Sequence, residues 1–189
     1  MGGLNMKRRL QWFAGIIIML LVIALCVERM PPFGERSVGQ RAARISASPQ
    51  FVDGKAQNLI PTSLGMNGEW VGVMGRYMRG GQEPDRELPV QVPTFAEDLN
   101  DTATMTWLGH SSVLLEMDGV RILTDPILSK RASPFQWMGP ARFHRAPIKA
   151  NQLPTLDAVL ISHDHYDHLD METISVLVGQ SVPFLVPLG

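Results

Sequence analysis

The stretch ISHDHYDHLD, residues 161–170, decides how the sequence is interpreted. It holds three of the chain's five histidines, interleaved with aspartates and one tyrosine. Side chains two positions apart on an extended backbone face the same side, so His163 and His165 are placed to bind one ion together. Where the chain then turns, Asp167 and His168 can address a second ion beside it. The spacing therefore predicts a metal site, and the alternative is a solvated polar loop.

The residues on either side of this stretch predict a strand before it and a helix after it. LDAVLIS (156–162) is a short apolar run that is typical of a strand buried on both faces. Asp170 is a candidate N-cap for a helix over residues 171–178. A loop between a strand and a helix is a common way to present metal ligands at the edge of a sheet.

The composition restricts the ligand chemistry. The single cysteine, Cys26, excludes an internal disulfide framework and a cysteine-based zinc finger, so histidines and carboxylates are the remaining ligands. These ligands suit Zn²⁺, and Fe or Mn stay open. Two ions about 3.5–4 Å apart can hold a bridging water whose pKa falls from about 15.7 towards 7. A hydrolytic function follows from that chemistry.

Further strands are predicted upstream of the histidines. Residues 104–109 and 112–117 are rich in apolar and β-branched side chains, which predicts two strands. Asp118-Gly119 follows as a two-residue turn of the kind that closes a hairpin. Residues 120–125 form the return strand. Together with the downstream helix, these strands predict an α/β (α+β) domain over residues 103–189.

The N-terminus predicts a membrane segment. Residues 10–27 carry no charge, and Lys7, Arg8 and Arg9 precede them. We interpret 10–27 as an uncleaved transmembrane signal anchor, with 1–9 as a cytoplasmic basic flank and the remaining chain on the non-cytoplasmic side. A cleaved signal peptide is the main alternative, and a lipoprotein site at Cys26 or a buried soluble helix is less favoured.

Residues 28–102 are rich in proline and glycine and predict a linker and covering segment. One exception is a helix expected over residues 67–78 behind Asn67 as a candidate N-cap. Its apolar stripe is expected to pack into the core, and it consists of Trp70, Met74, Tyr77 and Met78.

The metal motif resembles that of the metallo-β-lactamase superfamily. The residues TWLGHSSVLLEMDGVRILTDPILSKRASPFQWMGPARFHRAPI (106–148) and LPTLDAVLISHDHYDHLD (153–170) look like its N-acylphosphatidylethanolamine-hydrolysing phospholipase D branch. The resemblance implies an αββα sandwich, two Zn²⁺ ions and a phosphodiesterase acting on N-acyl phosphatidylethanolamine or a similar amphipathic phosphodiester. A lactonase-like hydrolase of the same superfamily is the alternative.

Carried over by position, the resemblance implies that His163 and His165 bind the first zinc, and that Asp167 and His168 bind the second. Asp167 is then also the catalytic residue, because it helps to position the attacking water. Asp125 is expected beneath the ligand loop, where it would accept the second N–H of a ligand imidazole. A simple Asp-Pro turn at the end of a strand is the alternative for Asp125.

Four further residues are candidates for substrate binding. His110 lies on a turn between two predicted strands, where a structural role is the alternative. In the loop 130–147, Arg131, Arg142 and Arg145 alternate with aromatic residues, which suits a phospholipid headgroup near a membrane. A solvated loop is the alternative there. The net charge of −1 offers no global attraction for nucleic acid, so no nucleic-acid partner is expected. The oligomeric state is left open.

The ligand set of the resembling family is only partly present in this sequence. The resemblance implies one more histidine for each metal and a bridging aspartate, all from later segments. After His168 the sequence offers only Asp170 and Glu172 as candidate ligands. We therefore expect residues 103–189 to be the N-terminal half of the sandwich of a longer enzyme, and a catalytically inactive remnant is the alternative.

Overall fold

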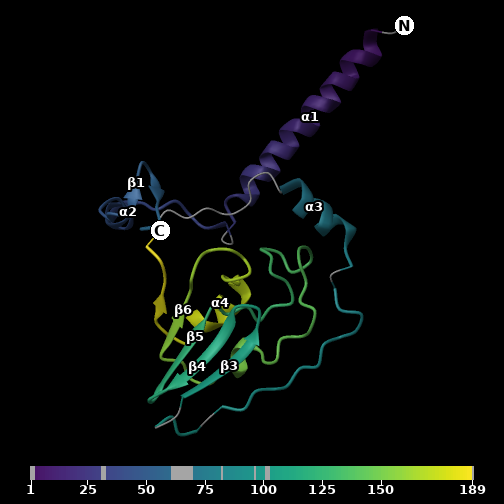
Figure 1. Cartoon of the computed structure of the whole chain (residues 1–189). Coiled ribbons are helices and arrows are strands. Elements are labelled where there is room, and N and C mark those ends of the chain that lie inside the picture. The colour runs from purple at the N-terminus through teal and green to yellow at the C-terminus, as the bar shows by residue number, and fades with distance from the viewer. Residues whose placement is uncertain are drawn as a thin grey trace. The chain divides into compact units, whose positions relative to one another are not determined.

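The computed structural model describes residues 3–30, 33–60, 70–81, 83–95, 97–100 and 103–188. The chain divides into two compact units, residues 1–38 and 39–189. The first contains helix α1 (Gly3–Val27), drawn in purple in Figure 1. Its stretch Met6–Val27 has 22 residues, a mean hydropathy of 2.6 and no buried part. By length and composition this helix suits a membrane span, and a signal sequence would have the same properties.

The second unit begins with three small elements. Helix α2 (Gly39–Ser46) buries Ile45, and strands β1 (Phe51–Val52) and β2 (Lys55–Ala56) form an antiparallel hairpin. Helix α3 (Trp70–Arg79) agrees with the helix predicted over 67–78, although Asn67 lies outside the described residues.

The prediction that the apolar stripe of this helix packs into the core is wrong. Trp70, Met74, Tyr77 and Met78 are 59%, 53%, 73% and 79% exposed. Periodicity shows only that the apolar side chains share one face of the helix. It does not supply the second surface that would bury them, and no described part of the chain covers this face.

The main sheet has the strand order β3-β4-β5-β6-β7. Strands β3 (Ala103–Gly109), β4 (Ser112–Met117) and β5 (Val120–Thr124) are antiparallel neighbours. Strands β6 (Ala158–Leu160) and β7 (Phe184–Leu185) add to them in parallel. Asp118 and Gly119 close the β4–β5 hairpin with φ angles of 49° and 83°, which suits a tight two-residue turn. The strands predicted from residue 104 onward are therefore confirmed.

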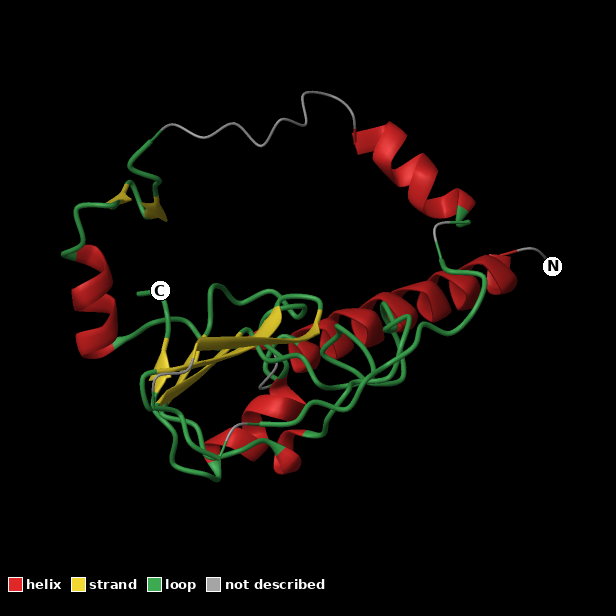
Figure 2. Cartoon of the chain, turned by 60° about the horizontal axis from the view of Figure 1, so that its bottom comes forward, coloured by secondary structure: helices red, strands yellow, loops and turns green. Residues whose placement is uncertain are grey.

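The core lies on one face of this sheet. Leu114, Leu123 and Val159 stand opposite one another on neighbouring strands, and each is fully buried. Leu177, from helix α4 (Met171–Val178), belongs to the same apolar cluster. In Figure 2, α4 lies on one side of the sheet. The segment before β6, which includes the short helix η2 (Ala150–Gln152), contributes Ile148, Leu153 and Leu156 to this core.

The opposite face of the sheet is open among the described residues. Met105 and Trp107 of β3 are 73% and 65% exposed, and Leu160 of β6 is 36% exposed. The prediction that 156–162 forms a strand buried on both faces is therefore wrong, because α4 and the segment before β6 cover one face only. The predicted fold class is confirmed: a mixed α/β domain with a five-stranded sheet, preceded in the sequence by an apolar helix, consistent with half of a metallo-β-lactamase domain.

Candidate metal centre

The histidine loop begins where β6 ends, and both of its ends are buried. Ile161 lies in the core, and Asp170 is only 4% exposed. Between them the backbone turns, because the amides of His168 and Leu169 both donate to the carbonyl oxygen of His165. The Asp170 carboxylate accepts a hydrogen bond from the Glu172 amide, so the predicted N-cap of α4 is confirmed. The loop is therefore fixed between a strand and a capped helix.

Asp125 lies beneath this loop, at the end of β5, with a left-handed φ of 39°. It is 8% exposed, and its carboxylate accepts hydrogen bonds from the Ser162 amide at 2.6 Å and the Ser162 hydroxyl at 2.8 Å. The His168 Nδ1–H donates to the same carboxylate at 2.9 Å. Burial alone would raise the pKa of Asp125, but the hydrogen bonds from His168 and Ser162 outweigh it and hold the pKa below 3.8.

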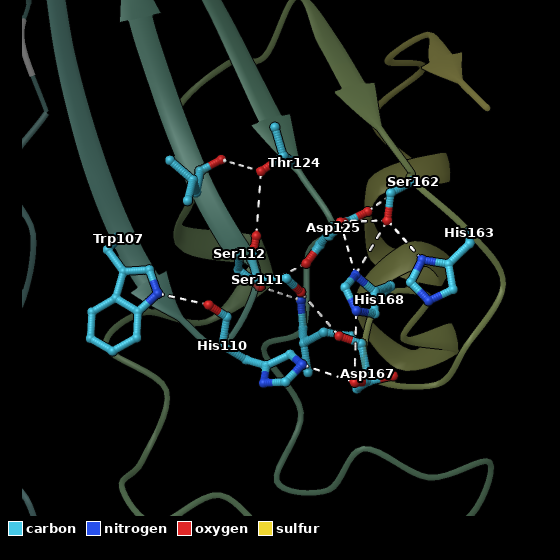
Figure 3. A network of polar contacts seen from close by, with 12 residues as sticks. Trp107, His110, Ser111, Ser112, Thr124, Asp125, Ser162, His163, Asp167 and His168 are labelled. Carbon is cyan, nitrogen blue, oxygen red and sulfur yellow. Dashed lines mark hydrogen bonds and ion pairs between the residues drawn. The ribbon is translucent and has the colours of Figure 1, made fainter. Parts of the chain in front are cut away.

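These contacts determine which ring nitrogen of each imidazole is free to bind a metal. Because Nδ1 of His168 donates to Asp125, the lone pair of this ring lies on Nε2. The Ser162 hydroxyl gives its proton to Asp125, so its oxygen accepts from Nδ1–H of His163 at 2.9 Å. The lone pair of His163 therefore also lies on Nε2. Figure 3 shows Ser162 beside the Asp125 carboxylate, with dashed lines from its hydroxyl to both rings.

The three histidines of the loop gather at this edge of the sheet. The ring centroids of His163 and His165 are 4.5 Å apart in a T-shaped arrangement, and those of His163 and His168 are 4.0 Å apart. The structure thus brings together the pair that the sequence assigned to the first ion. The ring of His168 lies closer to His163 than the ring of His165 does.

Asp167 faces His110, which comes from the turn between β3 and β4. The Asp167 Oδ2 atom is 2.9 Å from Nε2 of His110 and 3.7 Å from Nε2 of His168. The Ser111 hydroxyl donates to the Asp167 carbonyl oxygen at 3.1 Å. Burial would raise the pKa of Asp167, but the hydrogen bond from His110 and the nearby His168 lower it overall. The carboxylate is 41% exposed, so it is accessible from solvent.

The donor chemistry of this edge fits a divalent metal ion. One ligand atom each from His110, Asp167 and His168 lies within 4.8 Å of the other two. Imidazole nitrogens and a carboxylate oxygen suit Zn²⁺, and a ligand histidine is normally held through its second N–H, as Asp125 holds His168. Asp164 and Tyr166 are neighbours in the same loop, and burial raises the pKa of Tyr166.

The three candidate arginines lie in different surroundings. Arg142 donates to the carbonyl oxygens of Ile127 and Leu108, and burial lowers its pKa, so its guanidinium holds the backbone beside the His110 turn. Arg131 donates to the carbonyl oxygen of Gly139. Arg145 is exposed. Arg131 and Arg142 also line an open pocket of about 430 Å³ together with Phe143.

Sequence reasoning missed two residues of this network, Ser111 and Ser162. No spacing pattern in the sequence marks either residue, because serine occurs in many loops. Each of the two serines reaches its hydrogen-bond partner only once the chain has folded. The contact between His110 and Asp167 joins residues 57 positions apart, so the local pattern carried no sign of it. The ligand, catalytic and substrate-binding roles predicted for the individual residues stay predictions.

Comparison with known proteins agrees with the resemblance predicted from the sequence. Residues 104–185 match the beta-lactamase superfamily domain. An uncharacterized protein of Mycobacterium tuberculosis is 41% identical over 162 residues, which are 81% of this chain and 44% of that protein. The N-acyl-phosphatidylethanolamine-hydrolyzing phospholipase D 1 of Caenorhabditis elegans is 40% identical over 109 residues, which are 56% of this chain and 30% of that enzyme.

A third relative, named a metal-dependent hydrolase in Aeropyrum pernix, is 36% identical over 67 residues, which are 35% of this chain and 22% of that protein. These matches are consistent with a member of the metallo-β-lactamase superfamily, as the sequence predicted for this part of the chain. The chain spans less than half the length of these three relatives.

Proposed function

We propose that this sequence supplies part of the active site of a zinc-dependent phosphodiesterase. The observation that carries the proposal is the arrangement around Asp125 and Ser162. They hold His163 and His168 by Nδ1, so that both rings carry their lone pair on Nε2, and Nε2 of His168 lies 3.7 Å from the carboxylate of Asp167. Imidazoles held in this way are typical of a metal centre, whereas solvated surface histidines need no such support.

In this proposal the residues divide the work of the site, and Asp167 has two tasks. His163 and His165 hold the first zinc, and Asp167 and His168 hold the second. Bound zinc would lower the pKa of a coordinated water from about 15.7 towards 7 and polarise a phosphoryl oxygen. Asp167 orients the attacking water, because its carboxylate is open to solvent on one side. Asp125 keeps the lone pair of His168 directed away from the sheet.

The proposed substrate is N-acyl phosphatidylethanolamine or a similar amphipathic phosphodiester. The printed name of the nematode relative supports this choice. The loop 130–147 supports it independently, because Trp137 and Phe143 are 77% and 52% exposed and Arg145 is an exposed residue of the same loop. Aromatic rings can enter a lipid interface while guanidinium groups bind phosphate. A lactonase activity is the alternative within the same superfamily.

We further propose that α1 anchors the protein in a membrane as a single pass, with the hydrolase region on the non-cytoplasmic side. The support is the apolar stretch Met6–Val27 and the position of Lys7, Arg8 and Arg9 near its start. A reporter fused to the C-terminus tests the orientation. Reporter activity confined to the cytoplasm would contradict it.

The hydrolase proposal is tested with a chimera of the nematode relative. The 109 residues that match are replaced by the corresponding part of this chain, so that the relative supplies all other segments. We expect zinc-dependent release of phosphatidic acid from vesicles that contain N-acyl phosphatidylethanolamine. The same chimera with Asp167→Asn should lose this release, while Asp164→Asn is the matched control and should keep it.

Two other results would change the proposal. If the chimera folds and binds zinc but leaves the phospholipid intact, the substrate class is wrong, and a panel of lactones then tests the alternative. If Asp167→Asn releases phosphatidic acid as fast as the unmodified chimera, the proposed role of Asp167 is wrong.

A further inference from the structure

The turn between β3 and β4 holds His110 against the histidine loop. Gly109 and His110 both have left-handed φ angles, 104° and 49°, and the β3–β4 register shifts between Trp107 and Gly109. A left-handed conformation is uncommon for a histidine and costs backbone strain, so it persists only where surrounding contacts fix it. Such strain is common at functional sites.

Contacts on both sides of the turn supply this support. The Trp107 indole N–H donates to the His110 carbonyl oxygen at 2.8 Å, and Arg142 donates to the Leu108 carbonyl oxygen. On the other side, the Ser111 hydroxyl donates to the Asp167 carbonyl oxygen at 3.1 Å. The φ angle of Gly109 is one that L side chains rarely adopt, and a Cβ atom there would also displace the Arg142 guanidinium, so glycine is favoured at this position. The turn is therefore built to keep His110 at one place.

That place is beside the proposed ligands of the second ion. Nε2 of His110 is 2.9 Å from Oδ2 of Asp167, and Nε2 of His168 is 3.7 Å from the same oxygen. With metal–ligand bonds of about 2.0–2.2 Å, two ligand atoms of a tetrahedral site lie roughly 3.3–3.5 Å apart. The two measured distances bracket this value. Figure 3 shows the side chains of His110 and His168 on either side of Asp167.

We propose that His110 is a metal ligand, and that His110, Asp167 and His168 form a three-ligand site within this chain. The proposal rests on the proposed function, because it concerns the same metal centre. Two histidines, one carboxylate and an open position form a ligand set that catalytic zinc sites use. When metal binds Nε2 of His110, the ring proton sits on Nδ1, and the hydrogen bond to Asp167 is replaced by shared coordination. The second ion then has three ligands rather than the two assigned from the sequence.

The test measures metal binding rather than catalysis. The 189-residue chain carries His163→Ala and His165→Ala, which remove the two ligands assigned to the first ion. Co²⁺ affinity and the visible absorption of the bound ion are then measured with His110 intact and with His110→Ala or His110→Gln. We expect one Co²⁺ per chain when His110 is present, and a loss of Co²⁺ affinity of more than about 100-fold when it is replaced. Removing a residue that only hydrogen-bonds a metal ligand typically costs less, about 10–100-fold.

The His110→Gln variant separates a ligand from a hydrogen-bond donor. Glutamine keeps a side-chain N–H that can donate to Asp167, but it offers no imidazole nitrogen. If His110 is a ligand, glutamine does not restore the affinity or the absorption spectrum. Binding within threefold of the His110 chain would overturn the proposal in favour of a positioning role. His144→Ala is the matched control, because His144 lies near the same turn and outside the cluster, and it should leave binding unchanged.

The failure of this inference is distinguishable from the failure of the proposed function. If Asp167→Asn and His168→Ala abolish Co²⁺ binding while the His110 variants do not, the inference alone is wrong. If Asp167→Asn and His168→Ala leave Co²⁺ binding unchanged, the ion binds elsewhere in the chain, and the proposed metal centre is wrong. Absence of any Co²⁺ binding by the chain with His110 intact would overturn the three-ligand site directly.

Discussion

Two aspartates three positions apart in the histidine loop, Asp167 and Asp170, occupy opposite kinds of environment. Asp170 is 4% exposed, and its carboxylate accepts hydrogen bonds from five donors: the amides of Leu128, Ser129 and Glu172, and the hydroxyls of Ser129 and Thr173. Asp167 is 41% exposed and faces the imidazoles of His110 and His168.

This difference separates the residue that builds the loop from the residue that is free for chemistry. The donors around Asp170 come from the backbone and from short hydroxyl side chains, which fix its position and leave little capacity for a ligand. The partners of Asp167 are metal-binding side chains, and one side of its carboxylate is open to solvent. Both residues belong to one sequence motif, so their roles are distinguished by the donors that face them.

The largest effect is expected from Asp170→Asn. The side-chain amide would turn N–H groups toward buried donors, and each unsatisfied donor costs about 1–3 kcal/mol. We expect the free energy of unfolding to fall by about 3–5 kcal/mol, measured by denaturant titration with EDTA present. Metal binding should weaken as a consequence, because α4 and the loop before it lose their common anchor.

Glu172→Gln is the control for this change. Glu172 is exposed, and among the contacts described its carboxylate only shares the Ser129 hydroxyl proton, at 3.2 Å, with Asp170, which lies closer at 2.7 Å. Its effect on stability should stay below about 1 kcal/mol. If Asp170→Asn is as mild as Glu172→Gln, the carboxylate of Asp170 does not hold the loop in place.

Asp167→Asn should reverse this pattern. The residue lies near the surface, so unfolding in EDTA should change by less than about 1 kcal/mol. Metal affinity should fall at least about 100-fold, or about 2.7 kcal/mol, because the amide is a neutral and weaker ligand. Isothermal titration with Zn²⁺ measures the loss. Equal effects of Asp167→Asn and Asp170→Asn on both stability and binding would remove the distinction between the two residues.

The parts of this site that the sequence predicted are those with local signals. Three features can each be recognised from a few neighbouring residues: the strand before the loop, the N-cap at Asp170, and the spacing of His163 and His165. The contact between His110 and Asp167 and the bridging position of Ser162 arise from the pairing of β3, β4 and β5 with β6, which no local pattern encodes.

The two wrong predictions have a related cause. The apolar face of α3 and the outward face of β6 were both expected to be buried, because apolar residues are usually covered. Burial, however, requires a second layer, and periodicity describes only one surface. The exposure of Met74 and Leu160 shows that the described residues do not provide that layer.

A smaller effect is expected from Asp125→Asn. An amide N–H facing His168 in place of Oδ2 would favour the other tautomer and hide the Nε2 lone pair. Loss of such an outer partner typically lowers metal affinity roughly 10–100-fold. The expected affinity therefore lies between those of the native chain and Asp167→Asn. A Zn²⁺ affinity equal to that of the native chain would show that Asp125 does not orient His168.

Asp125 also predicts a pH dependence of stability in the metal-free chain. Its pKa in the folded chain is lower than the ordinary value of 3.8, so the folded state binds this proton less readily than the unfolded state. The resulting stability is present above pH 3.8 and is lost as the pH falls through the folded-state pKa. Asp125→Asn should make this loss shallower. Identical acid profiles with EDTA would contradict the contribution of Asp125.

The smallest effect is expected from Asp164→Asn, which removes the same charge from the same loop as Asp167→Asn. Asp164 is exposed, and its electrostatic effect is on Tyr166, whose pKa it helps to raise. If proximity to the histidines were enough to bind metal, both variants would weaken Zn²⁺ binding alike. We expect Asp164→Asn to change the affinity by less than about threefold, because long-range attraction between an exposed carboxylate and an ion is largely screened at physiological salt. A loss comparable to that of Asp167→Asn would mean that the loop attracts metal by its net charge, and that the contacts of Asp167 with His110 and His168 do not select the site.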